Sequence, residues 1–262
     1  MRPGHISIIV GGSRGIGQAI AGALAARGGS VFVIGRNRQR IDGTLQHLKT
    51  LGDGRHTGQV LDAAVPDDMS RMAAICKETY GRADLLVFSA VVTGYENITR
   101  MPPQLLDLPL IAWRKALDVN LNGVFLANKA VLPLMIPQGR GDIINIGSAL
   151  TRHGMRGRAH AASYSATKYA LAAFTKCLAS EVSECGIRVN AIFPGTVATP
   201  LIEGTALASG FGGQITARHL ADSLVRLLEF SIDCLPSEPF ILPMPGSGLH
   251  AQDRGAEDGP GS

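Results

Sequence analysis

Short apolar segments alternate with longer amphipathic segments along most of this 262-residue chain. The short segments are rich in β-branched residues and almost continuously apolar, which is typical of strands buried on both faces of a parallel sheet. The longer segments have the periodicity of helices that cover such a sheet. We therefore predict an α/β fold with a doubly wound parallel sheet. The predicted strands are Ile6–Val10, Val31–Ile34, His56–Leu61, Leu85–Phe88, Ile143–Ile146 and Arg188–Phe193, and the predicted helices are Ala19–Arg27, Arg40–Leu51, Asp68–Tyr80, a stretch around Trp113–Met135, Tyr164–Glu184 and Ala217–Phe230.

The length and the 45% hydrophobic content suit one domain with a large core. We assign that domain to residues 1–245. The stretch 246–262 is rich in glycine, aspartate and small residues and has no apolar period. We predict a mobile tail there.

Charge and cysteine content exclude several classes of function. The formal net charge of +4 is small, and no run of Lys or Arg interleaved with aromatic residues is present, so nucleic acid is not an expected partner. Cys76, Cys177, Cys185 and Cys234 have no metal-ligand spacing, and glycines interrupt the N-terminal segment where a secretory signal would be apolar. We expect no bound metal, reduced thiols and a cytoplasmic location. No apolar run is long enough for us to predict a membrane span.

A glycine-rich loop, GGSRGIG at residues 11–17, follows the first predicted strand. A strand that runs through such a loop into a helix presents backbone N–H groups and the positive end of the helix to a phosphate. The spacing of Gly11, Gly15 and Gly17 is G-x-x-x-G-x-G, which differs from the common dinucleotide fingerprint G-x-G-x-x-G. Taken alone, the loop is either a pyrophosphate cradle or a turn that needs glycine for packing.

The end of the second predicted strand bears on the choice of dinucleotide. A site for NAD(H) usually has an acidic residue there that binds the adenosine ribose hydroxyls, but here Gly35 and Arg36 end the strand. A guanidinium can bind a 2′-phosphate through two hydrogen bonds, and Arg14 in the glycine loop can add a second positive charge. These residues favour NADP(H) over NAD(H), although an arginine on a surface turn is more often only solvated.

Tyr164 and Lys168 are four residues apart in the predicted helix SYSATKYALAAF, so their side chains lie on one face about one turn apart. A lysine ammonium near a phenol favours the phenolate, and we predict that Lys168 lowers the pKa of Tyr164 toward neutral pH. Such a phenol would be an effective general acid and base. The alternative is a chance pairing, because one Tyr-x-x-x-Lys pair is not a specific signal by itself.

The order of these features resembles the short-chain dehydrogenase/reductase family, in particular its NADP(H)-dependent 3-oxoacyl and ketone reductases. The glycine loop, a serine, the Tyr-x-x-x-Lys pair and a Pro-Gly pair follow one another as they do in that family, over about Ile6 to Phe230. The resemblance implies a single-domain Rossmann fold with strand order 3-2-1-4-5-6-7. It also implies small-molecule substrates and a homodimer or homotetramer.

The resemblance further implies a role for each matching residue. Tyr164 would be the catalytic acid and base, and Lys168 would lower its pKa and bind the nicotinamide ribose. Ser148, at the end of DIINIGS, would bind the substrate carbonyl oxygen. Asn120, in LDVNLNGVF, would complete a proton relay through water to the lysine. The implied cofactor contacts are Gly11, Ser13, Arg14, Gly15, Ile16, Arg36, Asp62 at the adenine amino group, Ala90, Tyr164, Lys168, and Pro194, Gly195, Val197 and Thr199 around the nicotinamide carboxamide.

The sequence departs from the family pattern at several places, three of which bear on the site. Val10 replaces the usual threonine before the glycine loop, and FSAV at residues 88–91 replaces Asn-Asn-Ala-Gly, so that Val91 narrows the space there. The segment between Ser148 and Tyr164 is longer than usual and basic. It either attracts an anionic substrate, such as a thioester on a phosphate-bearing arm, or is simply solvated. Its basic residues are Arg152, His153, Arg156, Arg158 and His160.

Together these features predict an oxidoreductase that transfers hydride between NADP(H) and a ketone or secondary alcohol, with ketone reduction the favoured direction. An acyl or polyketide-like substrate is the narrower expectation. The alternative is a non-catalytic dinucleotide-binding or scaffold protein that has kept the fold. The altered FSAV segment favours that alternative, and the intact set of Asn120, Ser148, Tyr164 and Lys168 opposes it.

Overall fold

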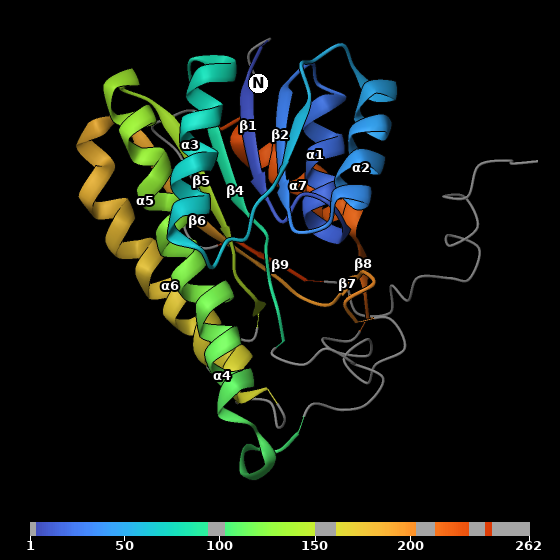
Figure 1. Cartoon of the computed structure of the whole chain (residues 1–262), viewed down its shortest axis with the longest axis vertical. Helices are drawn as coiled ribbons and strands as arrows, with labels where there is room; N and C mark the ends of the chain where they lie inside the picture. Colours follow the sequence, from blue (N-terminus) through green and yellow to red (C-terminus); the bar gives the residue numbers. More distant parts are fainter. Residues whose placement is uncertain (1–3, 94–102, 150–160, 203–212, 231–238, 243–262) are drawn as a thin grey trace, which may run out of the picture.

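A seven-stranded parallel sheet forms the centre of the molecule (Figure 1). The computed structural model describes residues 4–93, 103–149, 161–202, 213–230 and 239–242, so the predicted tail lies outside the described residues. The strand order is β3-β2-β1-β4-β5-β6-β9, which confirms the predicted fold and order. The strands are β1 (Ile6–Val10), β2 (Ser30–Gly35), β3 (Thr57–Val60), β4 (Leu85–Phe88), β5 (Gly141–Ile146), β6 (Ile187–Pro194) and β9 (Phe240–Ile241), and a separate pair joins β7 (Val197–Ala198) to β8 (Ile215–Thr216).

Helices cover both faces of the sheet and make two hydrophobic cores. Successive strand residues point to opposite faces, so Ile8 and Val10 of β1 belong to one core and Ile9 belongs to the other. This two-sided burial explains why the strands are continuously apolar. Helices α3 (Pro66–Tyr80), α5 (Gly123–Met135) and α6 (Ala162–Val182) pack on the first face, and α1 (Gly15–Ala25), α2 (Arg38–Leu51) and α7 (Ala217–Leu228) pack on the second.

Local signals in the sequence set several helix ends. Helix α2 begins after Asn37, whose side chain accepts a hydrogen bond of 2.9 Å from the Arg40 amide. Helix α3 begins at Pro66 and ends at Gly81, which has a φ of +74°. Helix α1 begins at Gly15, before the predicted start at Ala19, because the end of the glycine loop is already the first helical turn.

The long helical stretch predicted around Trp113–Met135 is interrupted. A π-helical turn, η2 (Asp118–Asn122), separates helix α4 (Leu110–Leu117) from α5. Such turns are rare inside helices and occur frequently at functional sites. The sequence pattern did not indicate it, because one extra residue in a turn hardly changes the apolar period.

The stretch Leu110–Gln138 has the length and mean hydropathy, 1.3, of a membrane-spanning helix. In the structure its α5 segment is a core helix, because Val124, Ala127, Val131 and Met135 are fully buried against the sheet. Core helices commonly meet the length and hydropathy criteria for a membrane span. The stretch is therefore explained by the fold.

A chain of buried polar side chains connects β5 to the two helices that carry the site. The Nδ2 atom of Asn145 donates to Thr175 Oγ1 of α6 over 3.1 Å, and Asn128 Nδ2 of α5 donates to Asn145 Oδ1 over 3.1 Å. All three side chains are buried in a mostly apolar core. Because an unpaired buried amide is costly, these bonds fix the position of both helices relative to the strand.

We predict that Asn145→Ala destabilises the protein by about 2 to 4 kcal/mol, because it leaves a cavity and two buried polar groups with fewer partners. Asn122→Ala is the matched control, since Asn122 is exposed and bonds only to Asp118 among the described residues. It should change stability by about 0.5 kcal/mol or less. Urea unfolding followed by circular dichroism measures both. Equal effects would contradict the structural role of Asn145.

Candidate active site

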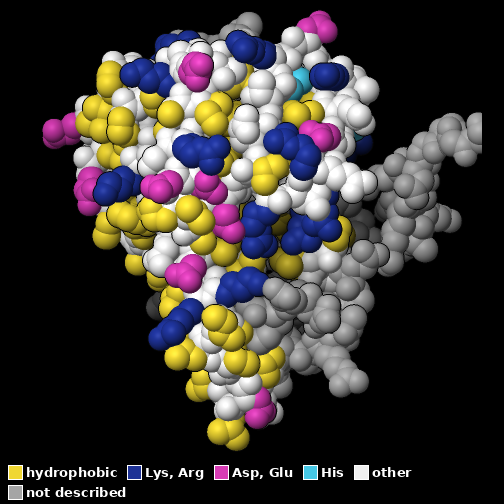
Figure 2. Space-filling view, in the orientation of Figure 1, with side chains coloured by type: hydrophobic (Ala, Val, Ile, Leu, Met, Phe, Trp, Pro, Cys, Tyr) yellow, Lys and Arg dark blue, Asp and Glu magenta, His cyan; other side chains and the backbone are white. Residues whose placement is uncertain are grey.

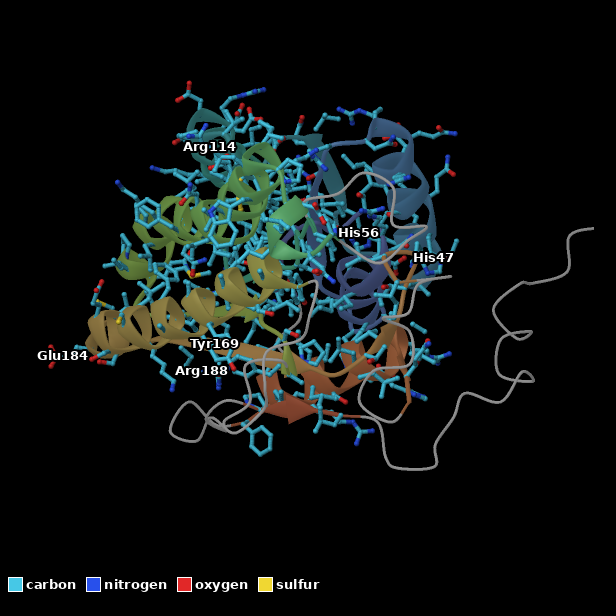
Figure 3. The ribbon with its side chains drawn as sticks, turned by 90° about the horizontal axis from the view of Figure 1, so that it is seen from below. His47, His56, Arg114, Tyr169, Glu184 and Arg188 are labelled. Atoms are coloured by element: carbon cyan, nitrogen blue, oxygen red, sulfur yellow. The ribbon has the colours of Figure 1, made fainter. Side chains whose placement is uncertain are left out.

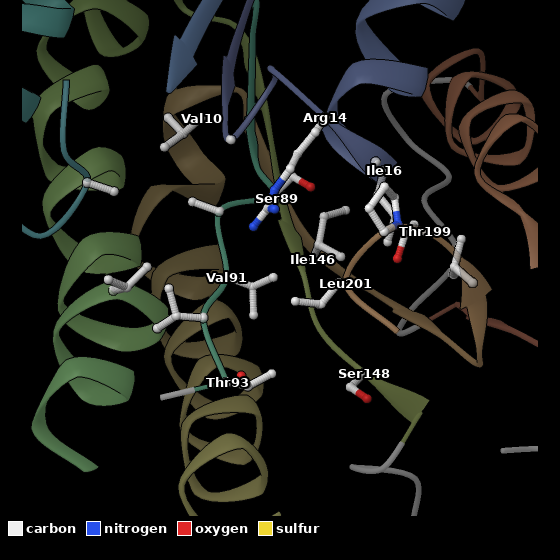
Figure 4. A pocket seen from close by; sticks show the side chains of 18 of the residues that line it. Val10, Arg14, Ile16, Ser89, Val91, Thr93, Ile146, Ser148, Thr199 and Leu201 are labelled. Carbon is white, nitrogen blue, oxygen red and sulfur yellow. The ribbon is translucent and has the colours of Figure 1, made fainter. Parts of the chain in front are cut away.

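A cavity of about 580 Å³ opens at the carboxyl ends of the central strands (Figure 4). The chain order of the strands reverses between β1 and β4, and in doubly wound sheets this is where ligands bind. Of the predicted site residues, all except Ser13 and Asn120 line this cavity. The fold therefore brings together side chains that are more than 180 positions apart, from Gly11 to Thr199.

The glycine loop comes very close to the chain that leaves β4. Gly11 has a φ of +82°, and a Cβ atom added there would lie 2.5 Å from the Ala90 backbone nitrogen. The amides of Gly11 and Gly12 both donate to the Ile34 carbonyl, at 2.9 and 3.1 Å, so backbone bonds hold the loop although Val10 carries no hydroxyl. The first turn of α1 then faces the cavity without a side-chain cap from Arg14. Uncapped helical N–H groups are a favourable place for a phosphate.

Three arginines line the same end of the cavity. Arg14 lies in the glycine loop, Arg36 follows β2, and Arg40 lies in the first turns of α2. Burial, together with the like charges of Arg40 and Arg36, lowers the pKa of Arg14 from its ordinary value. Arg36 Nη1 lies 3.8 Å from Asp62 Oδ2. This end of the cavity therefore suits an anion, and the residues present fit a dinucleotide that carries a 2′-phosphate.

Arg40 is the residue that the sequence analysis missed. Helical spacing from Arg36 gave no signal, because Arg36 precedes the N-cap residue Asn37 and lies outside α2. The sequence analysis gave Arg40 only as the first residue of a predicted helix, Arg40–Leu51. The structure adds it to the arginines around the cavity.

Tyr164 and Lys168 extend from one side of α6, as their spacing predicts. The Lys168 Nζ atom lies 5.7 Å from the centre of the Tyr164 ring. It donates a hydrogen bond of 2.6 Å to the carbonyl of Ile146 in β5, which ties the helix to the sheet. Ser148, just beyond the end of the same strand, makes a side-chain hydrogen bond with Tyr164. The three polar groups thus meet at one wall of the cavity.

The predicted direction of the Tyr164 pKa is wrong for this structure. Removal from water raises the pKa of Tyr164, and the hydrogen bond from Ser148 opposes that rise only in part. Burial also lowers the pKa of Lys168, to about 8. The lysine ammonium donates to the Ile146 carbonyl, and the removal of Tyr164 from water outweighs any favourable effect of that charge on the phenolate. At neutral pH the phenol therefore holds its proton.

Asn120 lies behind the cavity wall, in the π-helical turn. Its side chain is fully buried, with Oδ1 accepting from the Val92 amide over 2.9 Å and Nδ2 donating to the Val92 carbonyl over 2.8 Å. Nδ2 also lies 3.3 Å from Thr167 Oγ1, which donates to the Tyr164 carbonyl. Asn120 therefore links the segment after β4 to the helix that carries Tyr164. Its predicted part in a proton relay stays a prediction.

The segment after β6 forms the opposite wall. Pro194, Gly195, Val197 and Thr199 line the cavity, and the Gly195 amide donates to the Ile241 carbonyl of β9 over 2.8 Å. Several apolar side chains complete the walls. They are Val91, Val92, Val119, Ile146, Leu201 and Ile202. The predicted basic loop lies outside the described residues.

A family model described as short chain dehydrogenase matches residues 5–209. The chain belongs to the short-chain dehydrogenase family. The family match agrees with the fold, because its residues run from β1 through β7 and so include the strands between which the chain order reverses.

Two curated members of the short-chain dehydrogenase family illustrate the similarity. The short-chain reductase protein NovJ of Streptomyces niveus is 38% identical over 208 residues, which cover 79% of this chain and 74% of NovJ. The 3-oxoacyl-acyl-carrier-protein reductase of a Synechocystis species is 36% identical over 200 residues, 76% of each chain.

Solved structures of short-chain dehydrogenases share the architecture. A metagenomic short-chain oxidoreductase in complex with NADP is 26% identical, with a TM-score of 0.77 over 92% of this chain and 98% of that one. An actinorhodin polyketide ketoreductase variant with NADPH is 27% identical, with a TM-score of 0.79 over 94% and 98%.

We predict that Gly11→Ala lowers the stability of this short-chain dehydrogenase by at least about 2 kcal/mol, because the new Cβ would meet the Ala90 backbone and φ is positive. The matched control is Gly43→Ala in α2, where a Cβ would meet nothing within 4 Å. That change should stabilise the helix by about 0.5 to 1 kcal/mol. Thermal and urea unfolding measure both variants. A neutral Gly11→Ala would show that the loop does not approach Ala90 as described.

Proposed function

We propose that this protein is an NADP(H)-dependent ketoreductase that transfers hydride between the nicotinamide and a ketone or secondary alcohol. The observation that carries the proposal is the meeting of Ser148, Tyr164 and Lys168 on one wall of a cavity whose far end is the glycine loop. The hydrogen-bonded pair of Ser148 and Tyr164, the buried Lys168 ammonium and the phosphate-binding glycine loop together suit acid-catalysed reduction of a carbonyl.

The residues around the cavity would hold NADP(H) in two parts. The glycine loop and the start of α1 would bind the pyrophosphate, and the arginines at that end would bind the adenosine 2′-phosphate. Asp62 and Ala90 would contact the adenosine, and the segment of Pro194 and Gly195 would contact the nicotinamide. When bound, the cofactor supplies or accepts the hydride. The solved relatives that contain NADP or NADPH support this choice.

The chain's own groups would handle the oxygen atom of the substrate. The Ser148 hydroxyl would donate a hydrogen bond to the carbonyl oxygen and so polarise it. Tyr164 would donate its phenolic proton to the same oxygen, which its raised pKa allows because the phenol is protonated at neutral pH. Lys168 would stabilise the resulting phenolate by its positive charge. Asn120 would hold the segment after β4 and the helix α6 in fixed positions relative to each other.

An acyl or polyketide-like ketone is the proposed substrate class. The cavity walls near Ser148 are lined by Val91, Val92 and Leu201, which would contact an apolar chain. Relatives named as a 3-oxoacyl-acyl-carrier-protein reductase and a polyketide ketoreductase support this class. The homo-oligomer and the cytoplasmic location stay predictions.

We predict that Tyr164→Phe lowers kcat/KM for ketone reduction by about 10²- to 10⁴-fold, since it removes the proton donor but keeps the ring. Tyr169→Phe is the control on the same helix (Figure 3), because Tyr169 is 45% exposed. Its activity should match that of the unmodified protein. NADPH consumption with a panel of β-ketoacyl thioesters and cyclic ketones provides the assay.

The same experiment tests the alternative, a non-catalytic dinucleotide-binding protein. If no ketone in the panel is reduced and Tyr164→Phe binds NADPH as tightly as the unmodified protein, the catalytic proposal fails and the binding role is favoured. Loss of turnover with unchanged NADPH affinity supports the enzyme.

The pH profile of reduction follows from the two shifted groups. Lys168 is charged below about pH 8 and neutral above it, whereas Tyr164 keeps its proton to higher pH because its pKa is raised. We therefore expect kcat to be level near neutral pH and to fall as the pH rises through about 8, when the ammonium loses its proton. Steady-state rates at saturating NADPH measure this. A profile that stays level until tyrosine itself titrates would contradict a need for the lysine charge.

A further inference from the structure

Thr93 carries a buried hydroxyl group in the lining of the cavity. The residue lies on the segment that follows β4. Its Oγ1 atom is shielded from solvent and has no hydrogen-bond partner among the residues that the structure describes. A threonine hydroxyl can both donate and accept a hydrogen bond, and burying it without a partner costs free energy. This hydroxyl is therefore available to a ligand that enters the cavity.

Thr93 and the arginines lie at different ends of the cavity. In Figure 4 Arg14 lies at one end, whereas Thr93 and Ser148 lie at the other, and the Thr93 side chain extends toward the side on which Ser148 lies. Lys and Arg side chains gather near the centre of the face in Figure 2, at the level where β1 and β2 end in Figure 1. The Thr93 hydroxyl therefore belongs to the part of the cavity that holds Ser148, and not to the part that suits a phosphate.

The backbone next to Thr93 is held in place from behind the cavity wall. The amide and the carbonyl of Val92 both bond to the Asn120 side chain, over 2.9 and 2.8 Å. The Nδ2 atom of Asn120 also donates over 3.3 Å to Thr167 Oγ1, which donates to the Tyr164 carbonyl over 2.8 Å. One buried amide group therefore positions both the chain at Thr93 and the helix that carries Tyr164. The Thr93 side chain adds little freedom of its own, because a β-branched residue has few χ1 rotamers.

Apolar side chains line the same cavity as Thr93. Val91 and Val92 precede it in the chain, and Val119 and Leu201 come from other segments. In a largely apolar pocket, a small number of polar groups fixes the orientation of the ligand. The fold has already removed the Thr93 hydroxyl from water, so a ligand that bonds to it supplies a hydrogen bond that no described residue provides.

We propose that Thr93 is a substrate-positioning residue whose hydroxyl donates a hydrogen bond to a second oxygen atom of the substrate, apart from the oxygen that is reduced. The inference rests on the proposed function, in which Ser148 and Tyr164 bind the carbonyl that is reduced. It narrows the proposed substrate class to ketones that carry a further carbonyl oxygen, such as β-keto esters and thioesters. Two hydrogen-bonding points in fixed positions would hold the reacting carbonyl in one orientation.

The test compares Thr93→Val, which removes the hydroxyl and keeps the shape of the side chain, with Thr93→Ser, which keeps the hydroxyl. The substrates are β-keto esters and 2-alkanones of the same chain length, which lack the second oxygen. Thr93→Val should lower kcat/KM for the keto esters about 5- to 30-fold, mainly by raising KM, and leave that for the alkanones within about twofold. Thr93→Ser should keep the preference for the keto esters. Thr50→Val is the matched control and should change neither value, because Thr50 is exposed in α2 and bonds to the His47 carbonyl.

Stability and cofactor affinity separate substrate positioning from a structural role. Because the Thr93 hydroxyl is buried without a partner, Thr93→Val should leave the urea unfolding midpoint unchanged or raise it, whereas loss of a bond that supports the fold would lower it. NADPH affinity, measured by nicotinamide fluorescence, should stay within about twofold.

The outcomes distinguish the inference from the proposed function. An unchanged kcat/KM of Thr93→Val for keto esters, an equal loss for both substrate series, weaker NADPH binding or a lower unfolding midpoint overturns the inference and leaves the proposed function intact. An unmodified protein that reduces no ketone of either series with NADPH overturns both.

Discussion

The backbone contact between the glycine loop and the chain after β4 is the constraint on which the site depends. At the point where the strand order reverses, two chains leave the sheet in opposite directions and a crevice opens between them. Gly11 allows these chains to approach so closely that no other residue fits beside the Ala90 nitrogen. Because this approach fixes the floor of the crevice, the loop amides, the arginines and the wall that carries Tyr164 take their positions relative to it.

The wall that carries Tyr164 is held by a second set of bonds, most of which lie behind the cavity. Lys168 is anchored to the β5 backbone, and the Asn145 side chain joins the same strand to α6 one step further into the core. Asn120 links that helix to Val92 from the other side. These bonds are buried and therefore costly to break, so they fix Tyr164 in relation to Ser148 before any substrate binds. These buried bonds would therefore hold the proposed proton donor at a definite position.

The sequence predicted the sheet well and the electrostatics less well. The strands Ile6–Val10 and Leu85–Phe88 were placed at their observed bounds because burial on both faces leaves an unbroken apolar run. The spacing of Tyr164 and Lys168 predicted one shared face, since that depends only on helix geometry. The direction of the Tyr164 pKa could not be predicted, because it depends on which group the ammonium faces and on how much water the fold excludes. Arg40 was missed for the same reason: its place in the lining of the cavity depends on the tertiary fold.

The positive charges of Arg14, Arg36 and Arg40, which line one end of the cavity, bear on the proposed choice of cofactor. Burial, together with the like charges of Arg40 and Arg36, lowers the pKa of Arg14, and under the proposed function a 2′-phosphate would offset those charges. A ligand with a free 2′-hydroxyl makes hydrogen bonds but leaves those charges in place. Under the proposed function, discrimination between the two cofactors would come from the positive charge of these arginines as well as from the hydrogen bonds that they offer.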